Sequence, residues 1–98
     1  MRRAAKTDRN HAEVAHAITQ CGAWVIDCSA VGQGFPDLLV SHRGKLMMVE
    51  IKDGSKPPSA RKLTPSQVEF HARAKANGVP VHIVETLEQA IELVRGEP

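Results

Sequence analysis

The sequence predicts an α/β domain with the element order α-β-β-β-α-β-α, in which helices flank a four-stranded mixed sheet. Three observations support this fold class. Two short apolar runs are separated by a tight-turn signal at 43–44, and helix-capping patterns stand at 64–67 and 86–89. The helix expected after 64–67 separates the hairpin from a further apolar run at 79–84. Such a connection is expected to join parallel strands by a right-handed crossover.

The length and composition predict one globular domain that spans residues 1–98. The sequence is 42% hydrophobic and 24% charged, unlike that of a disordered chain. No apolar run is long enough to cross a bilayer, and no segment of signal-peptide type follows the basic start. We therefore expect a cytoplasmic protein with no membrane partner. The two cysteines, Cys21 and Cys28, are expected to be reduced and buried.

The first half of the chain predicts one helix and three strands. Residues 1–6 are expected to form a flexible basic arm, and the apolar periodicity of 7–21 is helical. Residues 23–28 favour a strand, and 38–40 and 46–51 favour the two strands of a hairpin. The hairpin strands are apolar on both faces, which predicts that both sides of the sheet are covered.

The second half predicts a loop, two capped helices and a strand. Residues 53–63 contain glycine, prolines and serines without an apolar period, which indicates a mobile loop. Thr64-Pro65-Ser66-Gln67 has the pattern of a capping box, and Thr86-Leu87-Glu88-Gln89 repeats it. A strand is expected at 79–84. The helix after Thr64 is expected to turn Val68, Ala72 and Ala76 inward, with Phe70 and Ala74 beside them.

The hairpin register brings two acidic side chains together. A turn centred between Arg43 and Gly44 places Asp37 directly opposite Glu50, with Cβ atoms about 5 Å apart. Lys52 lies two residues beyond Glu50 and points to the same face. Facing carboxylates repel, and a hard cation such as Mg²⁺, which prefers oxygen ligands, would cancel that repulsion. A solvated strand end with one ion pair is the alternative interpretation.

These residues form part of a longer pattern. Pro36-Asp37 and Glu50-Ile51-Lys52 resemble the Pro-Asp…(Asp/Glu)-x-Lys motif of the PD-(D/E)XK, restriction-endonuclease-like superfamily. Together with an early helix that carries Glu13 and a later helix that carries Gln67, they resemble the stand-alone VRR-NUC (virus-type replication-repair nuclease) domains. That branch is similar to the archaeal Holliday-junction resolvases. The resemblance extends from about residue 10 to 94 and implies a restriction-endonuclease-like core.

The resemblance also implies an activity and a set of site residues. It implies a Mg²⁺- or Mn²⁺-dependent endonuclease that hydrolyses phosphodiester bonds in branched DNA such as Holliday junctions, working as a homodimer. The implied catalytic residues are Asp37, Glu50, Lys52 and Gln67. The implied metal ligands are Glu13, Asp37, Glu50 and the backbone carbonyl of Ile51.

Other residues are candidates for contacting nucleic acid. Basic residues cluster near the start of the chain and after the second hairpin strand, which suits a phosphate backbone. The candidate contacts are Ser29, Gln33, Lys56, Arg61 and Lys62. An ordinary loop and a solvated surface are equally open interpretations. Phe35 is expected to anchor its loop.

Three residues have a structural interpretation beside the functional one. Glu13 fits a surface carboxylate as well as a metal ligand. Gln67 completes a capping box, and it could also position water or substrate beside the carboxylates. His71, one turn after Gln67, could face the site, but the pattern favours a surface position.

The sequence leaves other functions open. These are a flap-directed or general nuclease, a nuclease that acts on RNA, and a non-catalytic nucleic-acid-binding module of the same fold. The net charge of only +2 argues against strict junction specificity. If a phage encodes the protein, the expected location is the cytoplasm of the host cell.

Overall fold

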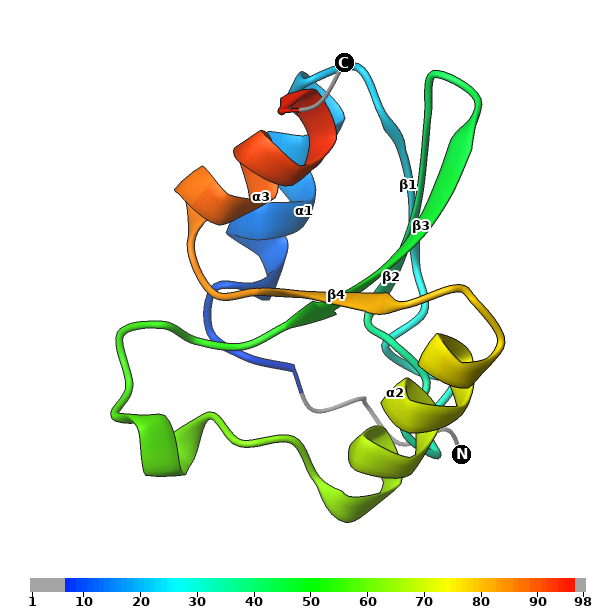
Figure 1. The fold of residues 1–98 in the computed structure, drawn as a ribbon. Helices are drawn as coiled ribbons and strands as arrows, with labels where there is room; N and C mark the ends of the chain where they lie inside the picture. The colour runs from blue at the N-terminus through cyan, green and yellow to red at the C-terminus, as the bar shows by residue number, and fades with distance from the viewer. Residues whose placement is uncertain (1–6, 97–98) are drawn as a thin grey trace, which may run out of the picture.

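A four-stranded sheet with the strand order β1-β2-β3-β4 forms the centre of the fold (Figure 1). The computed structural model describes residues 7–96, so the predicted basic arm at 1–6 lies outside the described residues. Strands β1 (Trp24–Asp27), β2 (Leu38–His42) and β3 (Lys45–Ile51) pair antiparallel in sequence order, and β4 (Val81–Val84) pairs parallel with β3. The predicted mixed sheet and parallel crossover are confirmed.

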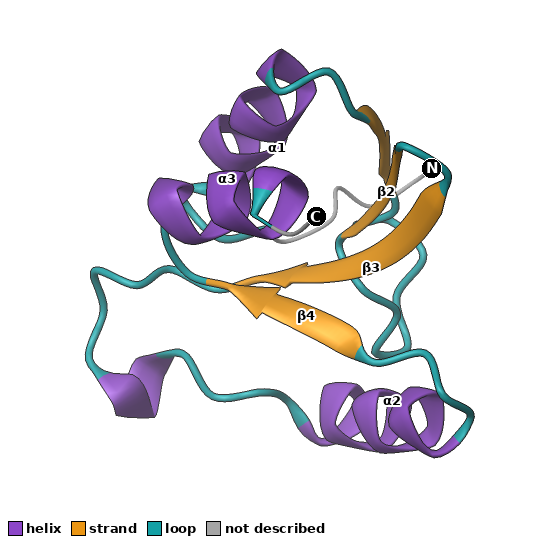
Figure 2. Cartoon of the chain, turned by 45° about the horizontal axis from the view of Figure 1, so that its top comes forward, coloured by secondary structure: helices purple, strands orange, loops and turns teal. Residues whose placement is uncertain are grey.

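The helices lie on both sides of this sheet. Helices α1 (His11–Gln20) and α3 (Leu87–Arg95) lie side by side on one face, and α2 (Pro65–Ala76) lies on the other (Figure 2). The loop at 53–63 contains a short 3₁₀ helix, Pro58–Ala60, which the sequence did not predict. Within residues 7–96, no helix combines the length and the apolar character needed to span a bilayer.

The hydrophobic core fills the space between the sheet and the α1–α3 pair. It combines alternate residues of the central strands with the inner stripes of the two helices, which is the arrangement expected for a sheet covered on that side. The main contributors are Leu38, Val40, Val49, Ile51, Val14, Ile18, Ala90 and Val94. Burying one such aliphatic side chain stabilises a fold by about 1.5–3 kcal/mol, so this face holds the domain together.

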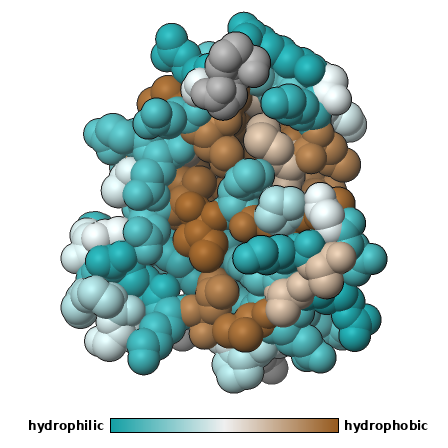
Figure 3. All heavy atoms as spheres, in the orientation of Figure 1, coloured by the Kyte–Doolittle hydropathy of each residue, from teal (hydrophilic) through white to brown (hydrophobic). Residues whose placement is uncertain are grey.

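The opposite face of the sheet is only partly covered. Trp24, Ser41 and Leu46 lie in one row across β1, β2 and β3. Trp24 is 67% exposed and Leu46 is 63% exposed. In Figure 3, apolar atoms reach the surface at the upper right, where the β2–β3 hairpin lies in Figure 1. The prediction that both faces are covered is therefore correct for the core face and wrong for this end of the other face.

The hairpin has the predicted turn and register. Arg43 and Gly44 both have positive φ angles, of 50° and 80°, as a two-residue turn of type I′ requires. His42 pairs with Lys45 across the turn, and the pairing continues outward to Leu38 and Val49. One further step along the same register brings Asp37 opposite Glu50.

The two predicted helix caps differ in detail. At α2, Gln67 N donates to Thr64 Oγ1 at 3.2 Å, and Thr64 N donates to Gln67 Oε1 at 2.9 Å, which confirms the capping box. At α3, Gln89 N donates to Thr86 Oγ1 at 3.1 Å, but Gln89 Oε1 accepts from Glu85 N at 2.6 Å. The second box is therefore only half formed, because the Gln89 side chain reaches past the cap to the preceding residue.

The predicted inner face of α2 is only partly correct. Val68 is 52% exposed, and Ala72 and Ala76 are also exposed. The residues with partly buried side chains are Phe70 and Ala74, as predicted, together with Gln67 and His71. The reason lies in the sheet beneath the helix, which presents the buried polar group of Glu50. A buried carboxyl group needs hydrogen-bond partners, and Gln67 and His71 supply them.

The loop before β2 is fastened to α2. The rings of Phe35 and Phe70 meet edge to face, with centroids 5.3 Å apart and planes inclined at 71°, which confirms Phe35 as an anchor. Gly34 has a φ of 82°, and a Cβ atom at that position would overlap the carbonyl oxygen of Ser66. Only glycine allows the loop to approach the first turn of α2 so closely.

We predict that Gly34→Ala destabilises the protein more than Gly32→Ala. Both glycines have positive φ angles, of 82° and 78°, so each substitution costs about 1 kcal/mol of backbone strain. A Cβ at Gly32 meets nothing within 4 Å, whereas one at Gly34 meets backbone. The additional loss for Gly34→Ala should be about 1–3 kcal/mol in urea unfolding. Equal losses for the two variants would show that the loop does not pack as described.

Candidate active site

Two carboxylates face one another where β2 begins and β3 ends. Asp37 directly precedes β2 and is partly buried, whereas Glu50 lies within β3 and is only 1% exposed. Asp37 Oδ2 accepts a hydrogen bond from the backbone N–H of Ile51 at 2.8 Å. This bond holds the Asp37 side chain against the strand that carries Glu50.

Helix α2 supplies the hydrogen-bond partners of Glu50. Gln67 Nε2 donates to Glu50 Oε2 at 3.0 Å, and His71 Nε2 lies 3.4 Å from Glu50 Oε1. The His71 side chain is 13% exposed and faces the carboxylate, so its predicted surface position is wrong. Gln67 and His71 are four residues apart and therefore lie on the same side of the helix.

Gln67 connects Glu50 to Lys52. Lys52 is 8% exposed, and its Nζ donates to Gln67 Oε1 at 2.9 Å. The two ends of one amide group therefore contact the carboxylate and the ammonium, while Oε1 also accepts the Thr64 N–H of the capping box. The Gln67 side chain thus caps α2 and also contacts Glu50 and Lys52.

The electrostatic environment favours the neutral form of Glu50. Burial, followed by the neighbouring Asp37 carboxyl, raises the pKa of Glu50 from 4.5 to about 8, and Lys52 opposes this increase. Burial, followed by the charge of Lys52, lowers the pKa of the His71 imidazole. The region is thus poorly suited to an uncompensated negative charge, and a cation bound between the carboxylates would remove that disadvantage.

The donor atoms at this position fit a hard divalent cation. Among residues 7–96, no three His, Cys, Asp or Glu side chains gather into a ligand cluster. Mg²⁺ does not need one, because proteins commonly hold it with one or two carboxylates, waters and substrate phosphate oxygens. Asp37 and Glu50 supply two such carboxylates.

The acidic residue expected on the first helix is exposed to solvent. Glu13 is exposed on α1, whose buried residues are His11, Val14 and Ile18. Its role as a metal ligand stays a prediction. The structure indicates Asp8 as a further acidic residue near the site, because the charge of Asp8 contributes to the raised pKa of Glu50. Sequence reasoning missed Asp8, since no local pattern relates a residue before the first helix to the end of β3.

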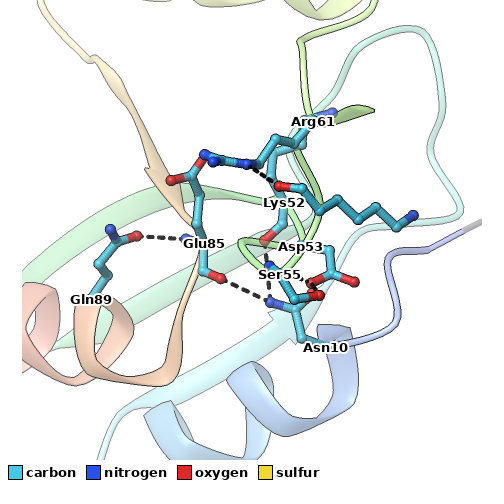
Figure 4. A network of polar contacts seen from close by, with 8 residues as sticks. Asn10, Lys52, Asp53, Ser55, Arg61, Glu85 and Gln89 are labelled. Atoms are coloured by element: carbon cyan, nitrogen blue, oxygen red, sulfur yellow. Dashed lines mark hydrogen bonds and ion pairs between the residues drawn. The ribbon is translucent and has the colours of Figure 1, made fainter. Parts of the chain in front are cut away.

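A polar network holds the backbone that follows β3 (Figure 4). Asn10 Nδ2 donates to the carbonyl oxygens of Lys52, at 3.2 Å, and Glu85, at 3.3 Å. The Glu85 carboxylate in turn pairs with Arg61 Nη1 at 2.8 Å. These contacts join three segments near the backbone of Lys52: the start of α1, the end of β4 and the loop at 53–63.

The three candidate nucleic-acid contacts in the loop at 53–63 differ in their exposure and in their partners within the protein. Lys56 and Lys62 are exposed. Arg61 pairs with Glu85, and its Nε donates to the carbonyl oxygen of Lys56 at 2.8 Å. Arg61 therefore already has partners within the protein, whereas the two lysines extend into solvent.

The two candidates before β2 also differ. The Ser29 hydroxyl and N–H both donate to Asp27 Oδ1, at 2.6 Å and 2.9 Å. The other oxygen of Asp27 lies 3.0 Å from His11 Nε2, so this group closes the end of β1 onto α1. Gln33 is exposed and has a φ angle of 59°. A role in DNA contact stays a prediction for all five candidates.

We predict that the metal-free protein loses stability as the pH rises from about 5 to 8. In this range the folded protein keeps a proton on Glu50 that the unfolded chain releases, so the free energy of unfolding falls with pH. The change should be on the order of a few kcal/mol in EDTA. Glu50→Gln should remove most of it.

Glu88→Gln is the matched control, because Glu88 is an exposed glutamate in the first turn of α3. Its profile of unfolding free energy against pH should follow that of the unsubstituted protein. If Glu50→Gln kept the same pH profile as well, Glu50 would not be the group with the raised pKa.

Comparisons with known proteins identify a relative of known structure. No protein-family model matches the chain, and no curated protein matches it. A solved structure described as "VRR_NUC domain" superimposes with a TM-score of 0.67 at 28% sequence identity. The alignment covers 91% of this chain and 98% of that chain, so the similarity includes the sheet and the helices on both of its faces.

Proposed function

The chain is a VRR-NUC domain, and we propose that it is a metal-dependent nuclease that hydrolyses phosphodiester bonds in DNA. The observation that carries the proposal is the buried contact of Gln67 with both Glu50 and Lys52, beside Asp37. A carboxylate pair that needs a cation and a buried ammonium group are thereby held at one end of the sheet. Buried ionisable groups with a strongly perturbed pKa cluster at functional sites.

The carboxylates of Asp37 and Glu50, with the backbone carbonyl of Ile51, would hold Mg²⁺ or Mn²⁺, and Glu13 would support them from α1. A divalent ion bound there supplies an activated water and neutralises charge that develops on the phosphate. The chain itself contributes two fixed groups. Lys52 would orient the attacking water or stabilise charge on the phosphoryl oxygens, and Gln67 would position water or substrate. Because the Gln67 amide contacts Glu50, Lys52 and the N–H of Thr64, rotating it would break three hydrogen bonds at once.

The substrate we propose is branched DNA, including Holliday junctions. The proposal is supported by the VRR-NUC resemblance and by basic side chains near the end of β3. Lys56 and Lys62 are exposed there and would contact the phosphate backbone. Arg61, Ser29 and Gln33 would extend this contact.

We propose further that the protein acts as a homodimer, because cutting symmetric strands of a junction requires two active sites. The support within the chain is the uncovered row of the sheet that contains Trp24 and Leu46. Exposed apolar patches that include an aromatic residue are typical of the centres of protein interfaces. In the proposed dimer this row lies between the two copies.

We predict that cleavage of labelled DNA requires Mg²⁺ or Mn²⁺ and stops in EDTA. Four-way junction, flap, duplex and single-stranded substrates should be compared, with the junction cut fastest. Lys52→Ala should reduce the rate by about 10²–10³-fold, because it removes a buried positive charge beside the reacting phosphate. Lys75→Ala, an exposed lysine on α2, should change the rate less than about twofold.

The outcomes separate the alternative functions. Equal cutting of every DNA substrate would support the proposed nuclease activity and contradict the proposed preference for junctions. Binding of DNA without cleavage by either metal would indicate a non-catalytic module. Cleavage of RNA alone would replace DNA as the substrate. Equal activity of Lys52→Ala and Lys75→Ala would contradict the role assigned to Lys52.

We predict that Trp24→Lys converts the dimer to a monomer. The substitution places a charge on the apolar row that the proposed interface buries, and burying an unpaired charge is strongly unfavourable. Sedimentation velocity at micromolar concentration should show a twofold lower mass for the variant. Val79→Lys, an apolar position that is 48% exposed and lies outside this row, is the control. A monomeric unsubstituted protein would contradict the proposal.

A further inference from the structure

A small hollow lies between the loop before β2 and the outer side of α2. It has a volume of about 210 Å³ and is lined by Gln33, Ser66, Glu69, Phe70 and Arg73. The four helix residues lie three or four positions apart, so they form one stripe along α2. This stripe is adjacent to the one from which Gln67 and His71 contact Glu50. The hollow therefore lies on the same helix that contributes Gln67 and His71 to the candidate active site.

The walls of the hollow are fixed relative to that site. Gly34 lies against the carbonyl of Ser66 and the N–H of Gln67, and the ring of Phe35 packs edge to face on Phe70. In Figure 1 the loop before β2 runs beside α2. The same contacts that seat the loop on α2 thus determine where a molecule in the hollow would lie relative to Glu50 and Lys52.

One wall residue has an unfavourable backbone conformation. Gln33 has a φ of 59°, between Gly32 at 78° and Gly34 at 82°. A residue with a Cβ atom is uncommon there, and glycine would be less strained. Strain of this kind is often found where a side chain serves function. The Gln33 side chain is exposed at the rim of the hollow, where its amide can both donate and accept hydrogen bonds.

The chemistry of the hollow suits a neutral, flat and polar group. Glu69 and Arg73 bring one negative and one positive charge, so the lining has no net charge and Glu69 would repel a phosphate. The Phe70 ring and the Arg73 guanidinium are groups on which nucleobases stack. At about 210 Å³ the hollow is smaller than the roughly 300–1,000 Å³ of sites for drug-sized ligands, which indicates one ring system.

We propose that this hollow binds one unpaired nucleobase of the DNA strand, close to the phosphate that is cut. The proposal rests on the proposed nuclease function and deepens it, because it specifies a substrate with a base released from the double helix. Branch points and single-stranded ends offer such a base, whereas an intact duplex must first unstack one. Gln33 would read the edge of the base, and Arg73 would stack on its face.

The test is a binding cycle that combines protein variants with abasic DNA. Fluorescence anisotropy in Ca²⁺ would measure the affinity of the protein for flap and junction DNA, with a single abasic site placed at successive positions around the branch. At one position the loss of the base should weaken binding of the unsubstituted protein about tenfold. The same loss should change the affinity of Arg73→Ala and of Gln33→Gly less than about threefold. Arg95→Ala, an exposed arginine at the end of α3, should behave like the unsubstituted protein.

Folding does not confuse the result, because Gln33→Gly relieves a strained φ and should be at least as stable in urea unfolding. An abasic effect of the same size in the unsubstituted protein and both variants would overturn the proposal, as would no abasic effect at any position. Cleavage of intact DNA in Mg²⁺ is a separate readout. Cleavage without the coupled abasic effect would contradict the nucleobase site and support the nuclease. The coupled abasic effect without cleavage would support the nucleobase site and contradict the nuclease.

Discussion

The burial of the Glu50 carboxyl group at the end of β3 is the constraint on which the rest of this structure depends. A buried carboxylate needs hydrogen-bond donors and a compensating charge. Helix α2 supplies hydrogen-bond partners through Gln67 and His71, and Lys52 supplies a nearby positive charge. Helix α2 therefore takes much of its orientation from polar contacts, which explains why Val68, Ala72 and Ala76 are exposed to solvent.

The two faces of the sheet have different roles: one buries the hydrophobic core, and the other carries the polar groups of the candidate site. The face beneath α1 and α3 is filled with aliphatic side chains and supplies most of the burial that stabilises a fold of this size. The other face can then expose Trp24 and Leu46 and carry polar groups beneath α2. Contacts such as that of Asn10 with the carbonyl of Lys52 connect the stable side to the end of β3. The backbone at the candidate active site is thus held in part by contacts with the start of α1.

The sequence predicted those features of the structure that depend on residues close together in the chain. The turn at Arg43 and Gly44 lies inside the hairpin, so its geometry propagates along the strands and brings Asp37 opposite Glu50. The capping box at Thr64 is equally local. The position of His71 was missed, because the weak apolar pattern of α2 does not show which side faces the sheet. Asp8 and Asn10 were missed because they meet residues far along the chain.

The order of the elements, the register of the hairpin and the pairing of Asp37 with Glu50 were already determined by the amino-acid sequence, because each follows from contacts between neighbours in the chain. The tertiary structure alone decided that Gln67 touches both Glu50 and Lys52, that Arg61 is held by Glu85, and that the loop of Gln33 forms a hollow with α2. These contacts join segments whose relative positions are set by the packing of the whole domain, and no periodicity within one segment encodes that packing.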